Sequence, residues 1–305
     1  MAPEINRLRG DFRITIISSA PESAMKREGE RAEVPSAVEI LHHKQPGVVK
    51  LGVGCMAFLF SKAGHKEMSS LREDGFSIGR FFDSALSYAH AFWLRRFCRK
   101  RGIFDKDNAL YYSFWFNSHL LALVLEKNDR ANDMKVVSRL HGYDLYNGRN
   151  AHLRQPFQRF KRDGCDRMFF ASANAKEAFK AEFGDQSKEG QYVISRLGVA
   201  NSTLDGVRKR KGRGHLIVSC SNVLPIKHVE KIAQALITLD RDDIQWVHFG
   251  DGPLLDKVKA SISRERFKAE FRGHVVNERI LEFYRDQSID AVILLSESEG
   301  GCPVC

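Results

Sequence analysis

Polar residues and glycines in the last third of the chain follow the ends of strand-like apolar runs. Asn222 and Lys227 follow one such run, and Gly250, Gly252 and Gly273 follow the next two. A lysine at the start of a helix can bind phosphate together with the unpaired N–H groups of that helix. Glycine lets the backbone approach a ligand closely. Taken singly, however, such a lysine is more often a solvated surface residue, and Gly-Asp-Gly-Pro is a common start of a helix.

The final residues, SESEGGCPVC, add carboxylates and further glycines after the apolar run 290–295. Glu297 and Glu299 are the carboxylates of this turn, and Glu297 is the weaker candidate for a role in the site. Gly300 and Gly301 would present backbone N–H groups. Because open α/β sheets bind ligands at the carboxyl edge of their strands, these residues are expected to belong to the same site.

In this order, the strings resemble the nucleotide-sugar site of retaining glycosyltransferases with the GT-B fold, the "glycosyl transferases group 1" family. The resemblance implies that Lys227 grips the donor diphosphate and that Glu299 hydrogen-bonds the sugar. Asn222 stands where the family usually has an arginine, so one positive charge is missing. The doubled glycine, Gly300 and Gly301, is one residue longer than the usual EG-x-P turn.

Two strings in the first two thirds of the chain also resemble this family. SRLHGYDLY places His141 at a strand end, where the family's histidine faces the transferred sugar, and Asp144 lies in the same turn. ISRLGV resembles the segment before the interdomain linker, where Gly198 approaches the nucleotide. A lone histidine is otherwise a common surface or core residue.

The resemblance implies an α/β fold of the GT-B class, with two Rossmann-like domains whose parallel sheets face each other across a cleft. It implies transfer of a hexose, with retention, from a nucleoside diphosphate sugar to a glycan or lipid-linked acceptor in surface polysaccharide synthesis. No metal or other cofactor is expected. Two alternatives remain, a catalytically inactive fragment of such an enzyme and a basic nucleic-acid-binding protein.

Hydrophobic patterns before residue 205 alternate between strand-like and helical, which predicts a doubly wound parallel sheet. Strands are expected at 12–19 (buried), 109–116, 135–141 and 167–173, and helices at 2–12, 78–102, 117–128 and 172–184. The helix at 78–102, with apolar Phe82, Ala85, Ala89 and Phe92, is interpreted as a core helix with a basic end. A helix lying in a membrane interface is the alternative.

The same alternation resumes after the glycine-rich basic run GVRKRKGRG. Strands are expected at 215–221, 244–250, 269–275 and 290–296 (buried), and helices at 228–239, 253–263 and 278–286. We therefore predict an acceptor-side domain at 1–205, a linker at 206–214 and a nucleotide-sugar domain at 215–305. Both domains are expected to be incomplete, because the family's first strand and second motif glutamate are missing.

Charge is unevenly distributed along the chain of 305 residues. The net charge is +10 overall, +8 over residues 1–205 and −3 over residues 215–305. A basic first domain suits an anionic membrane surface or phosphorylated acceptors, although a generally basic soluble surface would look the same. The acidic C-terminal part argues against nucleic acid as a partner.

The cysteines and the apolar runs indicate the cellular compartment in which the protein is expected to lie. The six cysteines are scattered, which is typical of a reducing environment, and Cys302 and Cys305 lack the second pair that a structural zinc site needs. The start of the chain has no apolar signal-peptide core, and the longest apolar run, 48–60, is too short to cross a bilayer. We expect a cytoplasmic protein, with peripheral contact at the inner membrane face as a further interpretation.

Overall fold

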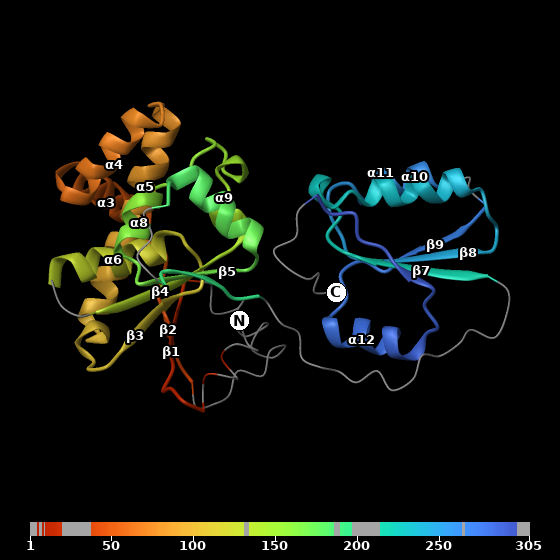
Figure 1. Cartoon of the computed structure of the whole chain (residues 1–305), viewed down its shortest axis with the longest axis horizontal. Helices are drawn as coiled ribbons and strands as arrows, with labels where there is room; N and C mark the ends of the chain where they lie inside the picture. Colours follow the sequence, from red (N-terminus) through yellow and green to blue (C-terminus); the bar gives the residue numbers. More distant parts are fainter. Residues whose placement is uncertain are drawn as a thin grey trace. The chain divides into compact units, whose positions relative to one another are not determined.

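The chain forms two compact units, Met1–Leu197 and Gly198–Cys305. The computed structural model describes residues 5, 8, 10–19, 38–130, 134–185, 190–196, 214–263 and 266–297. Each unit has its own parallel sheet with helices packed against it (Figure 1). Apart from Gly214, the expected linker lies outside the described residues, as does most of the helix expected at 2–12.

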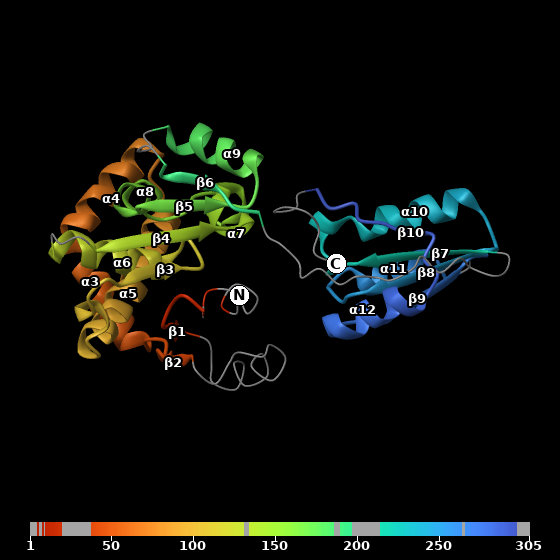
Figure 2. The same ribbon diagram turned by 60° about the horizontal axis from the view of Figure 1, so that its bottom comes forward.

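Unit 1 is built around a sheet of four parallel strands, in the order β3-β4-β5-β6 (Figure 2). The strands are β3 (Leu110–Ser113), β4 (Lys135–Leu140), β5 (Arg167–Phe170) and β6 (Tyr192–Ile194), linked by helices α6 (Ser118–Arg130), α7 (Gly142–Leu145), α8 (Gln158–Gly164) and α9 (Ala173–Phe183). The predicted apolar face of α6 is buried: Leu120, Leu121, Val124 and Leu125. Helix α9 begins and ends where its cap residues predict, with the Ser172 hydroxyl accepting from Ala175 N at 3.1 Å.

A second, two-stranded parallel sheet precedes these elements, formed by β1 (Thr15–Ser18) and β2 (Glu39–His42). The prediction of a buried strand at 12–19 is wrong in its burial, because all four residues of β1 are only half-buried. A sheet of two strands cannot cover both of its faces. Ser19 Oγ lies 2.9 Å from His119 Nε2, which joins the end of β1 to α6.

Three helices come between β2 and β3: α3 (Val48–Phe60), α4 (Lys62–Glu73) and α5 (Ile78–Lys100). Helices α3 and α5 pack closely, since a Cβ added at Gly54 would lie 2.6 Å from Ala89 Cα. Among the described residues, no helix is long and apolar enough to cross a membrane.

Helix α5 matches the core-helix interpretation with one correction. Ala85 and Ala89 are buried and Phe92 is half-buried. Phe82, near the start of the helix, is 62% exposed. At the basic end, Arg95 pairs with the buried carboxylate of Glu126 at 2.7 Å. Part of this positive charge is therefore compensated inside the unit.

Unit 2 has a sheet of four parallel strands in the order β10-β7-β8-β9. Its elements are β7 (His215–Cys220), α10 (Val229–Leu239), β8 (Ile244–Phe249), α11 (Leu255–Ser261), β9 (Lys268–Phe271), α12 (Asn277–Asp286) and β10 (Ala291–Val292). Helices α10 and α11 pack on one face of the sheet and α12 packs on the other (Figure 1). This is a doubly wound, Rossmann-like arrangement.

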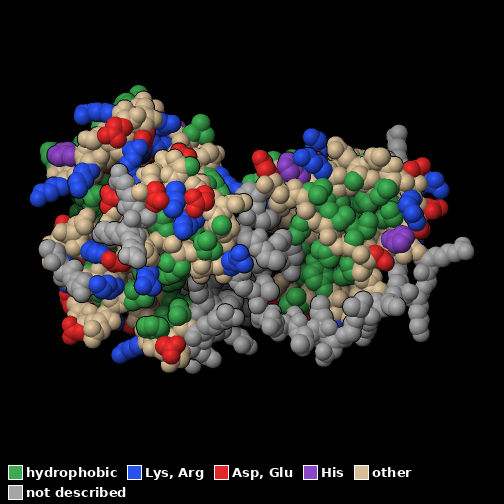
Figure 3. All heavy atoms as spheres, viewed as in Figure 1, with side chains coloured by type: hydrophobic (Ala, Val, Ile, Leu, Met, Phe, Trp, Pro, Cys, Tyr) green, Lys and Arg blue, Asp and Glu red, His purple; other side chains and the backbone are tan. Residues whose placement is uncertain are grey.

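A strand lies within the range expected at 290–296, but the prediction is wrong in its length and burial. Strand β10 has only two residues, both exposed, and Leu295 beyond it is 41% exposed. Its only hydrogen-bonded neighbour among the described strands is β7, so it lies at an edge of the sheet. Hydrophobic side chains consequently gather on this unit's surface between α10 and α12 (Figure 3, right-hand unit).

Candidate functional site

The loops that follow the strands of unit 2 contact one another at the carboxyl edge of the sheet. Val223 N, after β7, donates to Asp251 O, after β8, at 2.9 Å. Leu254 N donates back to Val223 O at 3.3 Å. These bonds hold the two loops side by side at the edge where parallel sheets bind ligands.

Gly250 and Gly252 are required by this contact between the loops. A Cβ added at Gly250 would lie 1.9 Å from Ser221 O, and its φ of +138° is rarely adopted by other residues. A Cβ added at Gly252 would lie 2.6 Å from Val223 O. The sequence predicts that the backbone approaches a ligand closely at these glycines. In the structure, the backbone of Gly250 and Gly252 closely approaches the backbone of Ser221 and Val223.

Gly273 brings the loop after β9 to the same edge. Gly250 N donates to Gly273 O at 2.8 Å, and Gly273 has a left-handed φ of +64°. No atom lies within 4 Å of a Cβ added there, so conformation rather than crowding favours glycine.

Lys227 ends a short 3₁₀ turn, Pro225–Lys227, two residues before α10 begins. Asn222 lies exposed in the same loop. Ile226 O accepts from Glu297 N at 2.9 Å, which brings the segment after β10 to the lysine turn. The structure thus assembles Asn222 and Lys227 at one edge of the sheet with the three glycines.

Four predicted site residues lie outside the described residues: Glu299, Gly300, Gly301 and Gly198. Their roles stay predictions. Among the described residues, no group of three or more His, Cys, Asp or Glu side chains could hold a metal ion.

A buried histidine that the sequence did not single out joins β8 to β7 near this edge of the sheet. His248 near the end of β8 is fully buried, and its Nδ1 lies 2.8 Å from Ser219 Oγ. Trp246 Nε1 donates to the same hydroxyl at 2.9 Å. Burial lowers the pKa of His248 to about 4, so the ring is neutral at neutral pH.

In unit 1, His141 lies directly after β4 and before α7, as its motif predicts. Its ring contacts the rings of Phe114 and Trp115, with centroid distances of 4.7 Å and 4.4 Å. His141 Nε2 is 3.0 Å from Phe114 O, so in the neutral ring this nitrogen carries the proton. The imidazole therefore has one fixed orientation at the carboxyl edge of the sheet.

Asp144 and Lys161 hold the backbone around this histidine. The Asp144 carboxylate accepts from His141 N at 2.6 Å and from Phe116 N at 2.5 Å. The ammonium of Lys161 donates to Phe116 O at 2.7 Å. Burial raises the pKa of Asp144 to about 6 and lowers that of Lys161 to about 7. Asp144 is thus a structural residue. The sequence analysis missed Lys161, because a single lysine in a polar helix sequence gives no sign that it is buried.

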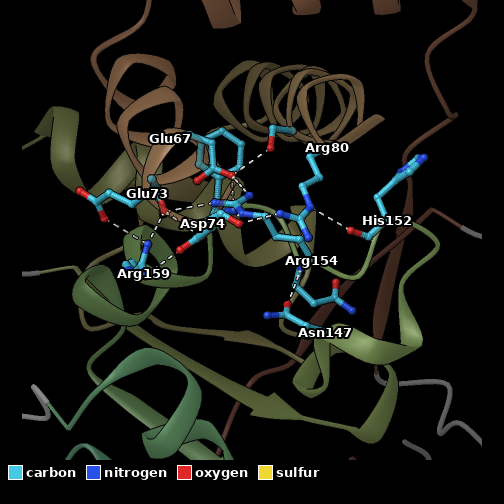
Figure 4. A network of polar contacts seen from close by, with 12 residues as sticks. Glu67, Glu73, Asp74, Arg80, Asn147, His152, Arg154 and Arg159 are labelled. Carbon is cyan, nitrogen blue, oxygen red and sulfur yellow. Dashed lines mark hydrogen bonds and ion pairs between the residues drawn. The ribbon is translucent and has the colours of Figure 1, made fainter. Parts of the chain in front are cut away.

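A second group of buried charges, also missed, lies in unit 1 around Glu67 and Arg154 (Figure 4). Glu67 Oε1 of α4 accepts from Arg154 Nη1 at 2.6 Å, Ser84 Oγ at 2.9 Å and Phe157 N at 3.0 Å. Arg154 also donates to Asp74 at 3.0 Å. These contacts join α4 and α5 to the segment between α7 and α8.

That segment and the first residue of α8 in turn hold α7. Gln155 Nε2 donates to Tyr143 O at 2.5 Å, and Gln158 Nε2 donates to Asp144 O at 2.7 Å. The charge network therefore reaches the His141 turn through two glutamine side chains.

Solved structures share the fold of this chain. The lipopolysaccharide outer core galactosyltransferase WaaB is 12% identical, with a TM-score of 0.56 over 95% of this chain and 76% of that one. Anabaena Alr3699/HepE, solved with UDP and glucose, is 14% identical, with a TM-score of 0.57 over 98% of this chain and 69% of that one. OtsA is 10% identical, with a TM-score of 0.56 over 95% and 79%.

This likeness extends over both units and confirms the expected fold class, GT-B, with two Rossmann-like units. No family model matches the chain, and no curated protein matches it in sequence.

Proposed function

We propose that this protein is a retaining glycosyltransferase of the group 1 family. It transfers a hexose from a nucleoside diphosphate sugar to a glycan or lipid-linked acceptor, without a metal or other cofactor. The observation that carries the proposal is the assembly of Lys227, Asn222 and three glycine turns at the carboxyl edge of the sheet in unit 2. This edge is where a fold of this class binds nucleotides.

In this proposal, Lys227 and the N–H groups of the first turn of α10 bind the diphosphate together. An ammonium beside a helix N-terminus adds its charge to that of the helix dipole. Asn222 adds a neutral hydrogen-bonding group, so the diphosphate is held with one charge fewer than the family's arginine would supply. As the bond between the sugar and the diphosphate breaks, Lys227 and the N–H groups of α10 stabilise the charge that develops on the departing diphosphate.

His141 is assigned to the sugar and acceptor side of the reaction. Its ring is fixed by Phe114 O and by two aromatic neighbours, which is the preorganisation that a transition-state contact needs. Glu299 would bind the sugar hydroxyls, with Gly300 and Gly301 offering backbone N–H groups, and Gly198 would approach the nucleotide. We assign the acceptor to the intermediates of surface polysaccharide synthesis. The reaction takes place on the cytoplasmic side of the membrane.

Calorimetric titration with UDP and with GDP tests the donor site. We expect Lys227→Ala to weaken binding by about 2 kcal/mol, roughly thirtyfold, as the loss of a charged hydrogen bond does. Lys257→Ala, which removes an exposed lysine on α11, is the matched control and should bind as the wild type does. Equal binding by all three proteins would remove Lys227 from the site, and nucleotide binding without transfer would favour the inactive alternative.

A further inference from the structure

Helix α3 presents an apolar face to solvent. Six apolar side chains of this helix are between 40% and 87% exposed: Val48, Val49, Val53, Met56, Leu59 and Phe60. Val49, Val53, Met56 and Phe60 follow each other at intervals of three or four residues, so they form one stripe along the helix. We call these six side chains the α3 face.

This face is the reverse of an ordinary surface helix, whose outward side is polar. The inner side of α3 is already occupied, since Phe58 is fully buried and Gly54 lies against Ala89. The outward apolar residues therefore do not complete the core of unit 1. A contiguous exposed apolar surface of this kind marks a binding surface for a protein or a membrane.

The charges around α3 favour an anionic partner. Residues 43–66 contain no aspartate or glutamate, while Lys44, Lys50 and Lys62 lie within the helix or within four residues of its ends. All three lysines are exposed. Lys50 Nζ lies 5.4 Å from the centre of the Trp93 ring, and Trp93 Nε1 donates to Lys50 O at 2.6 Å. Tryptophan and lysine side by side are typical of residues at a bilayer interface.

We propose that α3 lies flat in the headgroup region of an anionic lipid bilayer, with the α3 face toward the acyl chains and the lysines among the phosphates. Thirteen residues span about 20 Å as a helix, which is too short to cross the hydrocarbon core but suits a helix lying parallel to it. A second copy of this chain fits the face less well, because it would bring the lysines of both copies together.

The proposal stands apart from sugar transfer, since membrane binding is measured without donor or acceptor. The protein is sedimented with vesicles of equimolar phosphatidylglycerol and phosphatidylcholine, and with vesicles of phosphatidylcholine alone. We expect it to pellet with the anionic vesicles and to remain in solution with the neutral ones, and high salt should weaken the binding.

Two sets of variants locate the surface. Val49→Asp/Phe60→Asp places a negative charge at each end of the stripe. It should lower the partitioning of the protein onto anionic vesicles by about tenfold or more. Lys44→Glu/Lys62→Glu should have a similar effect while leaving the α3 face intact. Leu239→Asp, at a comparably exposed apolar residue of unit 2, is the matched control and should partition as the wild type does. Circular dichroism checks that each variant is folded.

Three outcomes would overturn the proposal. The wild type could remain in solution with both kinds of vesicle, or the aspartate pair could sediment as the wild type does. In the third outcome, analytical ultracentrifugation without lipid would show a dimer that Val49→Asp/Phe60→Asp converts to a monomer, so that the α3 face binds a second copy instead.

Discussion

Lys161 is a buried lysine whose protonation should tune the stability of unit 1. Its side chain is 2% exposed, and its ammonium donates to Phe116 O, next to the aromatic residues that hold His141. Burial lowers its pKa from 10.5 to about 7, so the folded protein favours the neutral amine. Lys161→Met keeps the length of the side chain and removes the titrating group.

The direction of the pH effect follows from the difference in the pKa of Lys161 between the folded and the unfolded protein. Above pH 7 the unfolded chain still binds the proton at Lys161, whereas the folded protein releases it. The free energy of unfolding therefore rises with pH from about 7 toward 10.5, and this gain is lost again as the pH falls from 10.5 to about 7, below which both states hold the proton. A rise from pH 7.0 to 8.5 should add about 1.5 kcal/mol, which is less than the roughly 2.1 kcal/mol that the limiting slope of about 1.4 kcal/mol per pH unit would give, because at pH 7.0 the folded protein has released only part of the proton.

Urea unfolding of the wild type and of Lys161→Met at the two pH values measures this contribution. The difference between the two proteins cancels the groups that titrate in both, including Cys98 and Cys165, whose thiol pKa burial raises to about 12. We expect the wild type to gain about 1.5 kcal/mol relative to the variant. The same pH dependence in both proteins would refute a neutral amine at this position.

Three further substitutions test the site and its support. His141→Ala should lower sugar transfer roughly a hundredfold while leaving calorimetric binding of UDP nearly unchanged, and an equal loss in both would assign the residue to the fold. Gly250→Ala would place a methyl group 1.9 Å from Ser221 O and should cost unit 2 about 2 kcal/mol or more in urea unfolding; a wild-type midpoint would contradict the tight contact. Glu67→Ala leaves Arg154 buried without its main partner and should cost about 3 kcal/mol, whereas a loss below about 1 kcal/mol would mean that the arginine finds water or another acceptor.

Periodicity predicted the regular elements well where helices and strands alternate. The strands from β3 to β9 lie within or near their expected ranges, with β6 as the exception, since no strand was expected there. Helices α3, α4, α7 and α8 and strand β2 were also missed. In α3 the apolar residues surround most of the helix, so no one-sided pattern appears, and α4 buries a glutamate where the pattern leads one to expect an apolar residue.

The candidate site was predictable at the level of loops rather than contacts. Lys227 and the glycine turns could be found because turn chemistry is local and the order of strands fixes which loops meet. The buried partners of His141 could not, because Asp144, Lys161 and the segment of Gln158 come together only in the folded unit. A charged residue in a sequence carries no mark of whether tertiary structure will bury it.

The close packing of Gly54 against Ala89 makes the proposed lipid-binding helix a preformed structure. Because the two backbones touch, α3 has one rotational setting and cannot turn its apolar stripe inward when no membrane is present. An amphipathic segment that is unfolded in solution loses conformational entropy when it becomes helical on a bilayer. Here that loss has already occurred during folding, so vesicle binding should leave the helical content of the protein unchanged.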